Sequence, residues 1–201
     1  GDEKLPWEEQ WGRQVTDYRE TNATTKRENP EAQDAEEFLA WMQTKVWKSL
    51  ADLLWGFTHL RTTVRAAELM QIITQTLGVL QPTVLNYGIH SGPTSFQKVV
   101  NNEYQDFRDK GELKAFVDDI CTATGEVGKV SNPLDYKNPE AVEMFLKHVW
   151  TMVQVMVRTI AAGFRYKLDK AFFCQLLQKA LGFIVGLGTR SLVPDKVKGI
   201  V

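Results

Sequence analysis

The residue types that carry out chemistry in proteins are present in this 201-residue chain, but they are spread along it. The three histidines, His59, His90 and His148, stand alone, and none lies three or four residues from another metal-ligating side chain, as zinc sites require. The two cysteines, Cys121 and Cys174, do not have the spacing of metal ligands either. The histidines are therefore expected to be structural or solvent-facing, and no metal site is predicted.

Two pairs of adjacent acidic residues, Asp118–Asp119 and Glu36–Glu37, could take part in acid–base chemistry. Each pair is interpreted as part of a helix, where neighbouring side chains point to different sides and cannot share a substrate. The segment GFIVGLGTRS has glycines but lacks the preceding strand and the Lys-Ser/Thr pair of a phosphate-binding loop. The sequence also contains no serine nucleophile elbow. It therefore predicts a protein that is not an enzyme, with no cofactor and no small-molecule substrate.

Basic side chains are better candidates for a function, because lysine and arginine neutralise the phosphates of nucleic acids. Some lie among aromatic residues near the N-terminus, and others lie at i,i+3 or i,i+4 spacing further on, which places them on common helix faces. The predicted nucleic-acid contacts are Arg13, Arg19, Lys26, Arg27, Lys45, Lys48, Arg61 and Arg65. The alternative interpretation of each is a solvated surface charge.

Four of these basic residues lie in the stretch from Asp34 to Leu80, so its secondary structure determines where they point. It contains no proline, and its apolar residues recur at three- and four-residue steps, which predicts one long helix that could bend near Gly56. Unbroken, that helix would span on the order of 70 Å. Burial on more than one of its sides would favour packing between subunits.

Four further helices are expected over 92–110, 112–124, 139–167 and 169–186, and no convincing strand alternation is present. The predicted fold class is therefore all-α. We expect an elongated helical bundle, completed by dimerisation, with an N-terminal extended or helical arm over 1–33 and a helical core domain over 34–201.

The net charge of −1 hides an asymmetry along the chain, because residues 141–201 carry a net +6 and the first 140 residues a net −7. Such a split can drive head-to-tail self-association or direct one end toward a polyanion. The acidic first ten residues do not resemble a signal peptide. The most apolar windows contain Arg158 and Lys179, so no membrane span is expected.

One segment, Asn86–Tyr104, resembles a known family of proteins. Tyr87-Gly88-Ile89, followed by Gly92-Pro93-Thr94 at the start of a helix, is similar to a segment in the major coat (capsid) proteins of filamentous archaeal double-stranded DNA viruses, the rudivirus, lipothrixvirus and tristromavirus group. The N-terminal Gln10-Trp11-Gly12-Arg13 and the Thr/Asn-rich run ending at Pro30 are similar to the arm of that family.

The resemblance implies a structural virion protein, made in the host cytoplasm, that dimerises and wraps linear double-stranded DNA into a helical filament. Its partners would be double-stranded DNA, in A form, and a copy of itself or a paralogous coat protein, with possible contact to a lipid envelope. By position, Arg13, Arg19, Lys26 and Arg27 would be contacts made by the arm. The low isoelectric point, about 6.4, is unusual for a protein that wraps DNA, because such a protein must neutralise phosphates with lysine and arginine.

Two alternatives stay open. The chain could be a helical capsid, matrix or adaptor protein that acts through protein–protein contacts without nucleic acid. It could also bind a membrane surface through Ala171–Val193, because basic residues are in excess in the C-terminal third.

Overall fold

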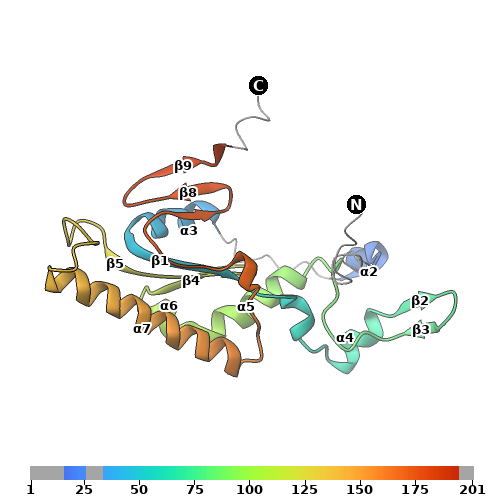
Figure 1. Ribbon diagram of the computed structural model, residues 1–201. Helices are drawn as coiled ribbons and strands as arrows, with labels where there is room; N and C mark the ends of the chain where they lie inside the picture. Colours follow the sequence, from blue (N-terminus) through green and yellow to red (C-terminus); the bar gives the residue numbers. More distant parts are fainter. Residues whose placement is uncertain (1–15, 26–33, 195–201) are drawn as a thin grey trace, which may run out of the picture. The chain divides into compact units, whose positions relative to one another are not determined.

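The computed structural model describes residues 16–25 and 34–194. The chain divides into two compact units, one made of residues 1–28 and 57–95 and the other of residues 29–56 and 96–201. Both units contain strands as well as helices, so the predicted all-α helical bundle is wrong (Figure 1).

The second unit is built on a four-stranded antiparallel sheet. Its strands lie in the order β4 (Leu113–Phe116), β5 (Asp119–Glu126), β1 (Lys45–Asp52) and β6 (Phe172–Gln175). The central strand β1 pairs with β5 along its length and with β6 on its other side.

The long helix predicted over 34–80 is wrong, because the chain leaves the helical conformation after a few turns. Helix α3 covers Ala35–Gln43, and Asp34 caps it by accepting a hydrogen bond from the Glu36 backbone N–H. Strand β1 then begins, and six of its eight residues are buried. A strand that is covered on both faces has no polar alternation, so its apolar residues can also match a helical spacing. That ambiguity explains the error.

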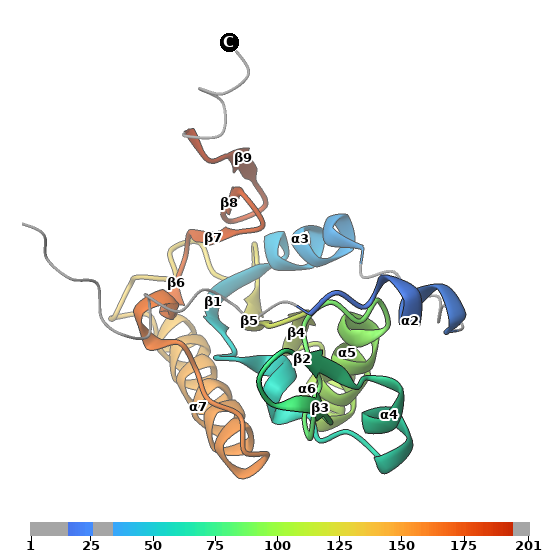
Figure 2. The same ribbon diagram turned by 90° about the vertical axis from the view of Figure 1, so that its right-hand side faces the viewer.

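Elements cover both faces of this sheet, as Figures 1 and 2 show. On one face, α3 packs with β1, β5 and the small three-stranded sheet of β7 (Gln178–Ala180), β8 (Phe183–Val185) and β9 (Arg190–Leu192). The core cluster on this face consists of Phe38, Leu39, Met42, Leu50, Cys121, Ala123, Ala180 and Val185. The helices predicted over 112–124 and 169–186 are therefore wrong, because both segments form strands.

On the other face lies α7 (Pro139–Ala161), which packs against β5 and β1. It begins where the sequence predicts, with Asn138 accepting a hydrogen bond from the Glu140 N–H, and ends at Ala161 rather than near residue 167. The fully buried His148 faces the sheet, where its Nε2 lies 2.8 Å from Ser49 Oγ and its Nδ1 lies 3.1 Å from Thr124 Oγ1. The histidine is thus a buried, hydrogen-bonded part of the core, as expected for a structural residue.

The burial of His148 predicts a loss of stability in mild acid. Burial lowers the pKa of its imidazole to about 4 from 6.5, and the charge of Lys48 acts in the same direction. Between these values the unfolded chain binds a proton that the folded chain does not, so the free energy of unfolding falls as the pH falls from about 6.5 to about 4. Urea unfolding at several pH values, for the parent chain and His148→Gln, measures this effect. An equal loss in both proteins would contradict the assignment.

Two further helices of this part of the chain lead toward the sheet edge. Helix α5 (Gly92–Glu103) begins in the first unit and continues into the second, and α6 (Gln105–Asp109) follows it. After α7, the short 3₁₀ helix η2 (Leu168–Lys170) precedes β6.

The first unit contains smaller elements. These are α2 (Arg19–Thr24), most of η1 (Gly56–His59), α4 (Val64–Leu69), and the hairpin of β2 (Ile72–Thr74) and β3 (Gly78–Leu80). The Tyr18 hydroxyl donates to the Met70 carbonyl, and the Asn22 side chain bonds both Gly88 and His90. The predicted arm boundary at residues 33/34 adjoins 26–33, which lie outside the described residues, and it stays a prediction. No helix in the described ranges is long and apolar enough to cross a membrane.

Candidate active site

The candidate active site lies where β1 ends and β5 begins. The antiparallel register pairs Asp52, the last residue of β1, with Asp119, the first residue of β5. Val117 and Asp118 form the turn between β4 and β5, and Val117 is in the left-handed region, with φ of 57°. The backbone N–H of Leu53 donates to the Asp118 carbonyl at 2.8 Å, which fixes the turn against the chain that leaves β1. Strand pairing thus holds Asp52 and Asp119 side by side, and Asp118 precedes Asp119 in the turn.

The pairing perturbs the carboxyl of Asp119. The pKa of Asp119 is raised above its ordinary value, first by burial and then by a hydrogen bond from its carboxyl to Asp52 and by the negative charges of Asp52 and Asp118. Lys170 opposes this shift, and its Nζ lies 4.0 Å from Asp52 Oδ2. A shared proton between two carboxyls is the usual result when like charges meet without sufficient positive charge. The pair is therefore short of positive charge.

The segment after α7 brings Lys170 to this position. The Leu54 N–H donates to the Arg165 carbonyl at 2.7 Å, and the Lys167 N–H donates to the Asp52 carbonyl at 2.9 Å. This backbone pairing extends the sheet edge beside the end of β1, so η2 follows directly and carries Lys170.

Gln97 of α5 holds the turn that carries Asp118. Its Oε1 accepts a hydrogen bond from the Val117 N–H at 2.7 Å, and its Nε2 donates to Asn101 Oδ1 at 2.8 Å and to the Ala115 carbonyl at 3.4 Å. The side chain is buried, so water cannot easily replace it. Gln97 thus connects the helix to the end of β4 and to the first residue of the β4–β5 turn.

Replacing Gln97 by leucine should destabilise the protein by about 1–3 kcal/mol, because the part-buried backbone N–H of Val117 would lose the Gln97 side chain as its acceptor. Gln105→Leu is the matched control, since Gln105 is exposed and bonds groups on its own short helix. The control should change stability by less than about 0.5 kcal/mol. Urea denaturation of both variants gives the comparison, and equal effects would show that Gln97 does not hold the turn.

The carboxylates of Asp52 and Asp119 suit a divalent cation. Carboxylate oxygens are the preferred ligands of Mg²⁺, and a bound cation would supply the positive charge that the pair lacks. No group of three or more His, Cys, Asp or Glu side chains is placed to enclose a metal in the described part of the chain. Mg²⁺, however, is commonly held by one or two carboxylates together with the phosphates of a substrate. The residues present therefore fit a cation that binds with a phosphorylated substrate.

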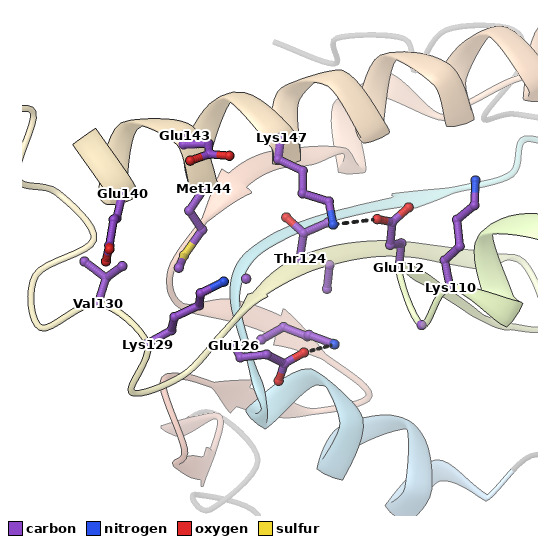
Figure 3. Close-up of a pocket in the computed structure, with 14 residues that line it drawn as sticks. Lys110, Glu112, Thr124, Glu126, Lys129, Val130, Glu140, Glu143, Met144 and Lys147 are labelled. Carbon is purple, nitrogen blue, oxygen red and sulfur yellow. Dashed lines mark hydrogen bonds and ion pairs between the residues drawn. The ribbon is translucent and has the colours of Figure 1, made fainter. Parts of the chain in front are cut away.

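Away from these carboxylates, a hollow of about 340 Å³ lies between the first turns of α7 and the far half of β5 (Figure 3). Lysines and glutamates line it in equal number, and they neutralise each other in part: Lys147 Nζ lies 3.0 Å from Glu112 Oε1, and Lys45 pairs with Glu126. We therefore assign no reaction to this hollow.

The residues predicted from the sequence as nucleic-acid contacts do not gather at the carboxylates. Arg13, Lys26 and Arg27 lie outside the described residues. Arg19 is exposed and pairs with Asp17, with Nη2 at 2.6 Å from Oδ2.

Lys45 and Lys48 lie on β1 and not on a helix face. Lys45 pairs with Glu126. Lys48 is fully buried, and its Nζ donates to the carbonyls of Lys45 at 2.7 Å, Leu176 at 3.1 Å and Val46 at 3.3 Å. Burial lowers the pKa of this lysine to about 8.

Arg61 and Arg65 are both exposed in the first unit, but they do not share a helix as predicted. Arg61 lies in an isolated bridge with Val84, and Arg65 lies on α4. The contact of the predicted basic residues with nucleic acid stays a prediction.

Sequence reasoning rejected Asp118–Asp119 as a site and did not single out Asp52. The rejection assumed a helix, whereas Asp118 lies in a turn and Asp119 opens a strand. The available signal was an apolar run, a short turn, two acidic residues and a second apolar run, which together are typical of a hairpin with carboxylates at its tip.

Comparison with solved structures finds a similar fold within foamy viral protease-reverse transcriptases. The chain is similar to the foamy viral protease-reverse transcriptase dRH in complex with double-stranded DNA, with a TM-score of 0.74 and 23% identity over 94% of this chain and 30% of that one. It is also similar to the foamy viral protease-reverse transcriptase in complex with RNA/DNA hybrid, with a TM-score of 0.71 and 22% identity over 93% and 23% of the two chains. The native prototype foamy virus enzyme gives a TM-score of 0.64 at 23% identity, over 89% of this chain and 21% of that one.

This chain therefore spans less than a third of the length of these three neighbours. No family model matches it. No curated protein matches it either.

These similarities overturn four predictions made from the sequence. The resemblance to coat proteins of filamentous archaeal viruses is wrong, because the fold is shared with reverse transcriptases over nearly the whole chain. The predicted capsid function and filament-forming role depended on that resemblance and are wrong as well. The exclusion of an enzyme is also wrong, because it relied in part on a helix at Asp118–Asp119, where the structure has a turn and the start of a strand, and because the fold is shared with the foamy viral enzymes. The first two of these neighbours were solved in complex with double-stranded DNA and with RNA/DNA hybrid.

Proposed function

We propose that this chain is the catalytic core of a template-directed nucleic-acid polymerase of the reverse transcriptase kind. The reaction would join a nucleotide to the 3′-hydroxyl of a primer and release pyrophosphate. The observation that carries the proposal is the hydrogen-bonded carboxyl pair of Asp52 and Asp119, with Asp118 at the adjacent turn. The similarity to reverse transcriptases bound to DNA or to RNA/DNA hybrid supports it.

Asp52 and Asp119 would hold a divalent cation together with the phosphates of the nucleotide. Such cations neutralise the negative charge that develops on the attacking and leaving oxygens during phosphoryl transfer. The half-buried Asp52 and Asp119 place their charges where solvent screens them least, and the exposed Asp118 can reach a substrate from the turn. Lys170, 4.0 Å from Asp52, orients that carboxylate by attraction. The nucleotide would then be the small-molecule substrate that the sequence did not predict.

The test is a primer-extension assay with the 201-residue chain, a 5′-labelled DNA primer on an RNA or DNA template, all four nucleoside triphosphates and Mg²⁺. Lengthening of the primer that stops when Mg²⁺ is chelated supports the proposal. Shortening of a labelled strand instead identifies a nuclease and overturns it. Absence of any change, together with no rise in melting temperature on addition of Mn²⁺ and a nucleoside triphosphate, also overturns it, because the carboxylates would then hold no cation.

A further inference from the structure

Strand β6, at one edge of the four-stranded sheet, contains an extra residue where it pairs with β1. Two pairs of residues fix the register of these strands, Lys48 with Gln175 and Leu50 with Phe172. One residue of β1, Ser49, therefore lies opposite two residues of β6, Phe173 and Cys174, which is the arrangement of a β-bulge. Cys174 is in the left-handed region, with φ of 53°, and this conformation costs free energy in a residue other than glycine. Neighbouring groups must therefore stabilise the bulge.

The hydroxyl of Ser49 holds the bulge from one face of the sheet. Its Oγ accepts a hydrogen bond from the Cys174 N–H at 3.0 Å. It also lies 2.8 Å from His148 Nε2, on the side that α7 covers. Ser49 is buried, so water cannot easily replace its hydroxyl. A side chain of the opposite strand thus satisfies the backbone N–H at the point where the bulge interrupts the ladder.

The ammonium group of Lys48 holds the chain just after the bulge. Its Nζ donates to the Leu176 carbonyl at 3.1 Å and to two carbonyls of its own strand, those of Lys45 and Val46. The full burial of this charge is costly, and the three carbonyl dipoles offset part of the cost. Side chains of adjacent strand residues point to opposite faces, so Lys48 and Ser49 act from the two sides of the sheet.

The extra residue decides which side chain of the preceding segment comes level with Asp52. Continued by two residues from the pair nearest to the candidate site, the bulged register brings Lys170 level with Asp52. Without the extra residue, every position of β6 before the bulge would move by one, and the uncharged Ala171 would come level with Asp52 instead. The distance of 4.0 Å from Lys170 Nζ to Asp52 Oδ2 agrees with the bulged register.

We propose that Lys48 and Ser49 are positioning residues that together hold the bulge at Cys174. The bulge in turn places Lys170 beside Asp52. The effect of these residues on the reaction rests on the polymerase activity proposed above, because Lys170 acts there by orienting a carboxylate of the candidate site. The register itself does not rest on that activity and can be measured without it, so the two proposals can fail separately.

The first experiment reads the register of the full chain by NMR. Leu50 and Phe172 are cross-strand partners, so their backbone protons should show a nuclear Overhauser contact. The variant with Lys48→Met and Ser49→Ala lacks both groups that hold the bulge and should lose this contact. Thr124→Val is the matched control, because it removes a buried hydrogen bond beneath α7 without touching the bulge, and it should keep the contact. A folded double variant in which the contact is unchanged overturns the proposal.

The second experiment deletes Cys174 in the double variant. An unbulged strand of that length keeps Lys170 level with Asp52 and needs no groups to hold a bulge. Primer extension should fall by about tenfold or more in the double variant, because small misplacements at a reacting site are costly, and it should recover on deletion of Cys174 together with the NMR contact. Residues with a role in stability alone would instead give a lower melting temperature and no recovery, and that outcome overturns the proposal.

The third experiment asks whether the effect on activity passes through Lys170. Lys170→Met should lower primer extension on its own. Adding Lys48→Met and Ser49→Ala to Lys170→Met should lower it little further, because the side chain that the bulge positions is already absent. Independent losses that multiply would show that Lys48 and Ser49 act by another route, and they would overturn the proposed positioning. The melting temperature of each variant is recorded as a check on folding.

Discussion

Replacing Asp119 by asparagine should lower primer extension by at least about a hundredfold while leaving the protein at least as stable as before. The carboxylate would lose its charge but keep its shape, so the cation that it helps to hold would be bound more weakly. Stabilisation of a phosphoryl-transfer transition state by metal ions amounts to several kcal/mol, and each 1.36 kcal/mol corresponds to a factor of ten in rate. Rates measured at saturating Mg²⁺ and nucleotide give the comparison.

The stability of Asp119→Asn, unlike its activity, should not fall. Asp119 is a half-buried acid whose pKa is raised by burial and by Asp52, so at neutral pH it is costly to keep charged in the folded protein. Asparagine removes that repulsion, and the melting temperature of Asp119→Asn should equal or exceed that of the parent chain. Added Mn²⁺ should raise the melting temperature of the parent chain more than that of the variant.

Asp109→Asn is the matched control, since Asp109 is an exposed carboxylate at the end of α6 that accepts a hydrogen bond from Gln105. It should leave both the rate and the response to Mn²⁺ unchanged. If Asp109→Asn and Asp119→Asn behaved alike, the carboxyl pair would have no special role. A variant that unfolds would show up in the melting curve and would be distinguished from one that has lost its cation.

Replacing Gly56 by alanine should destabilise the protein by about 2–3 kcal/mol. Gly56 lies four residues after Asp52, and a Cβ there would come within 2.5 Å of Cζ of Phe96. The Phe96 ring is fully buried and stacks edge-on against Phe164, with centroids 6.1 Å apart, so it cannot move away without disturbing the core. Overpacking of a tight core typically costs about 1–3 kcal/mol.

A double-mutant cycle tests the assigned cause. Phe96→Leu shortens the ring that meets the new methyl group, so Gly56→Ala should cost less in the Phe96→Leu background than in the parent chain, by about 1 kcal/mol or more. Gly92→Ala supplies the control, because a Cβ at Gly92 would meet its first neighbour, Leu85, at 3.9 Å. Urea denaturation of the four proteins gives the coupling. Additive effects would mean that the close approach to Phe96 is not the source of the strain.

The sequence predicts helices where local signals mark both the start and the spacing. The Asn138-Pro139-Glu140 signal marks the start of α7, and Gly92-Pro93 marks the start of α5, because capping residues and proline act within one turn of the chain. Beyond these starts, spacing alone is misleading. Apolar residues of β1 recur at steps that fit a helix, but the strand is buried on both faces and its partner β5 lies some seventy residues away in the sequence.

The candidate site depends on that long-range pairing. Asp52 and Asp119 become neighbours only through the register of β1 with β5, which no local pattern specifies. The acidic pair at 118–119 can be recognised in the sequence, but whether it can form a site depends on the assumed secondary structure. On a helix the two side chains diverge, whereas at a hairpin tip they lie beside the end of the adjoining strand. The sequence also does not tell which of the predicted basic residues are accessible to a ligand. Lys48 is buried and donates to backbone carbonyls, whereas Arg65 is exposed to solvent.

The register of β1 against β5 also decides which kinds of sequence change this chain can absorb. Side chains alternate between the two faces of a strand, so inserting or deleting one residue between Lys45 and Asp52 would turn Asp52 toward the opposite face and break its pairing with Asp119. Substitutions in the same strand would leave that pairing intact. During sequence drift or library design, the length of these two strands is therefore the quantity to preserve, while the mostly exposed loop at 131–137, beyond the buried Val130, is expected to accept insertions and deletions.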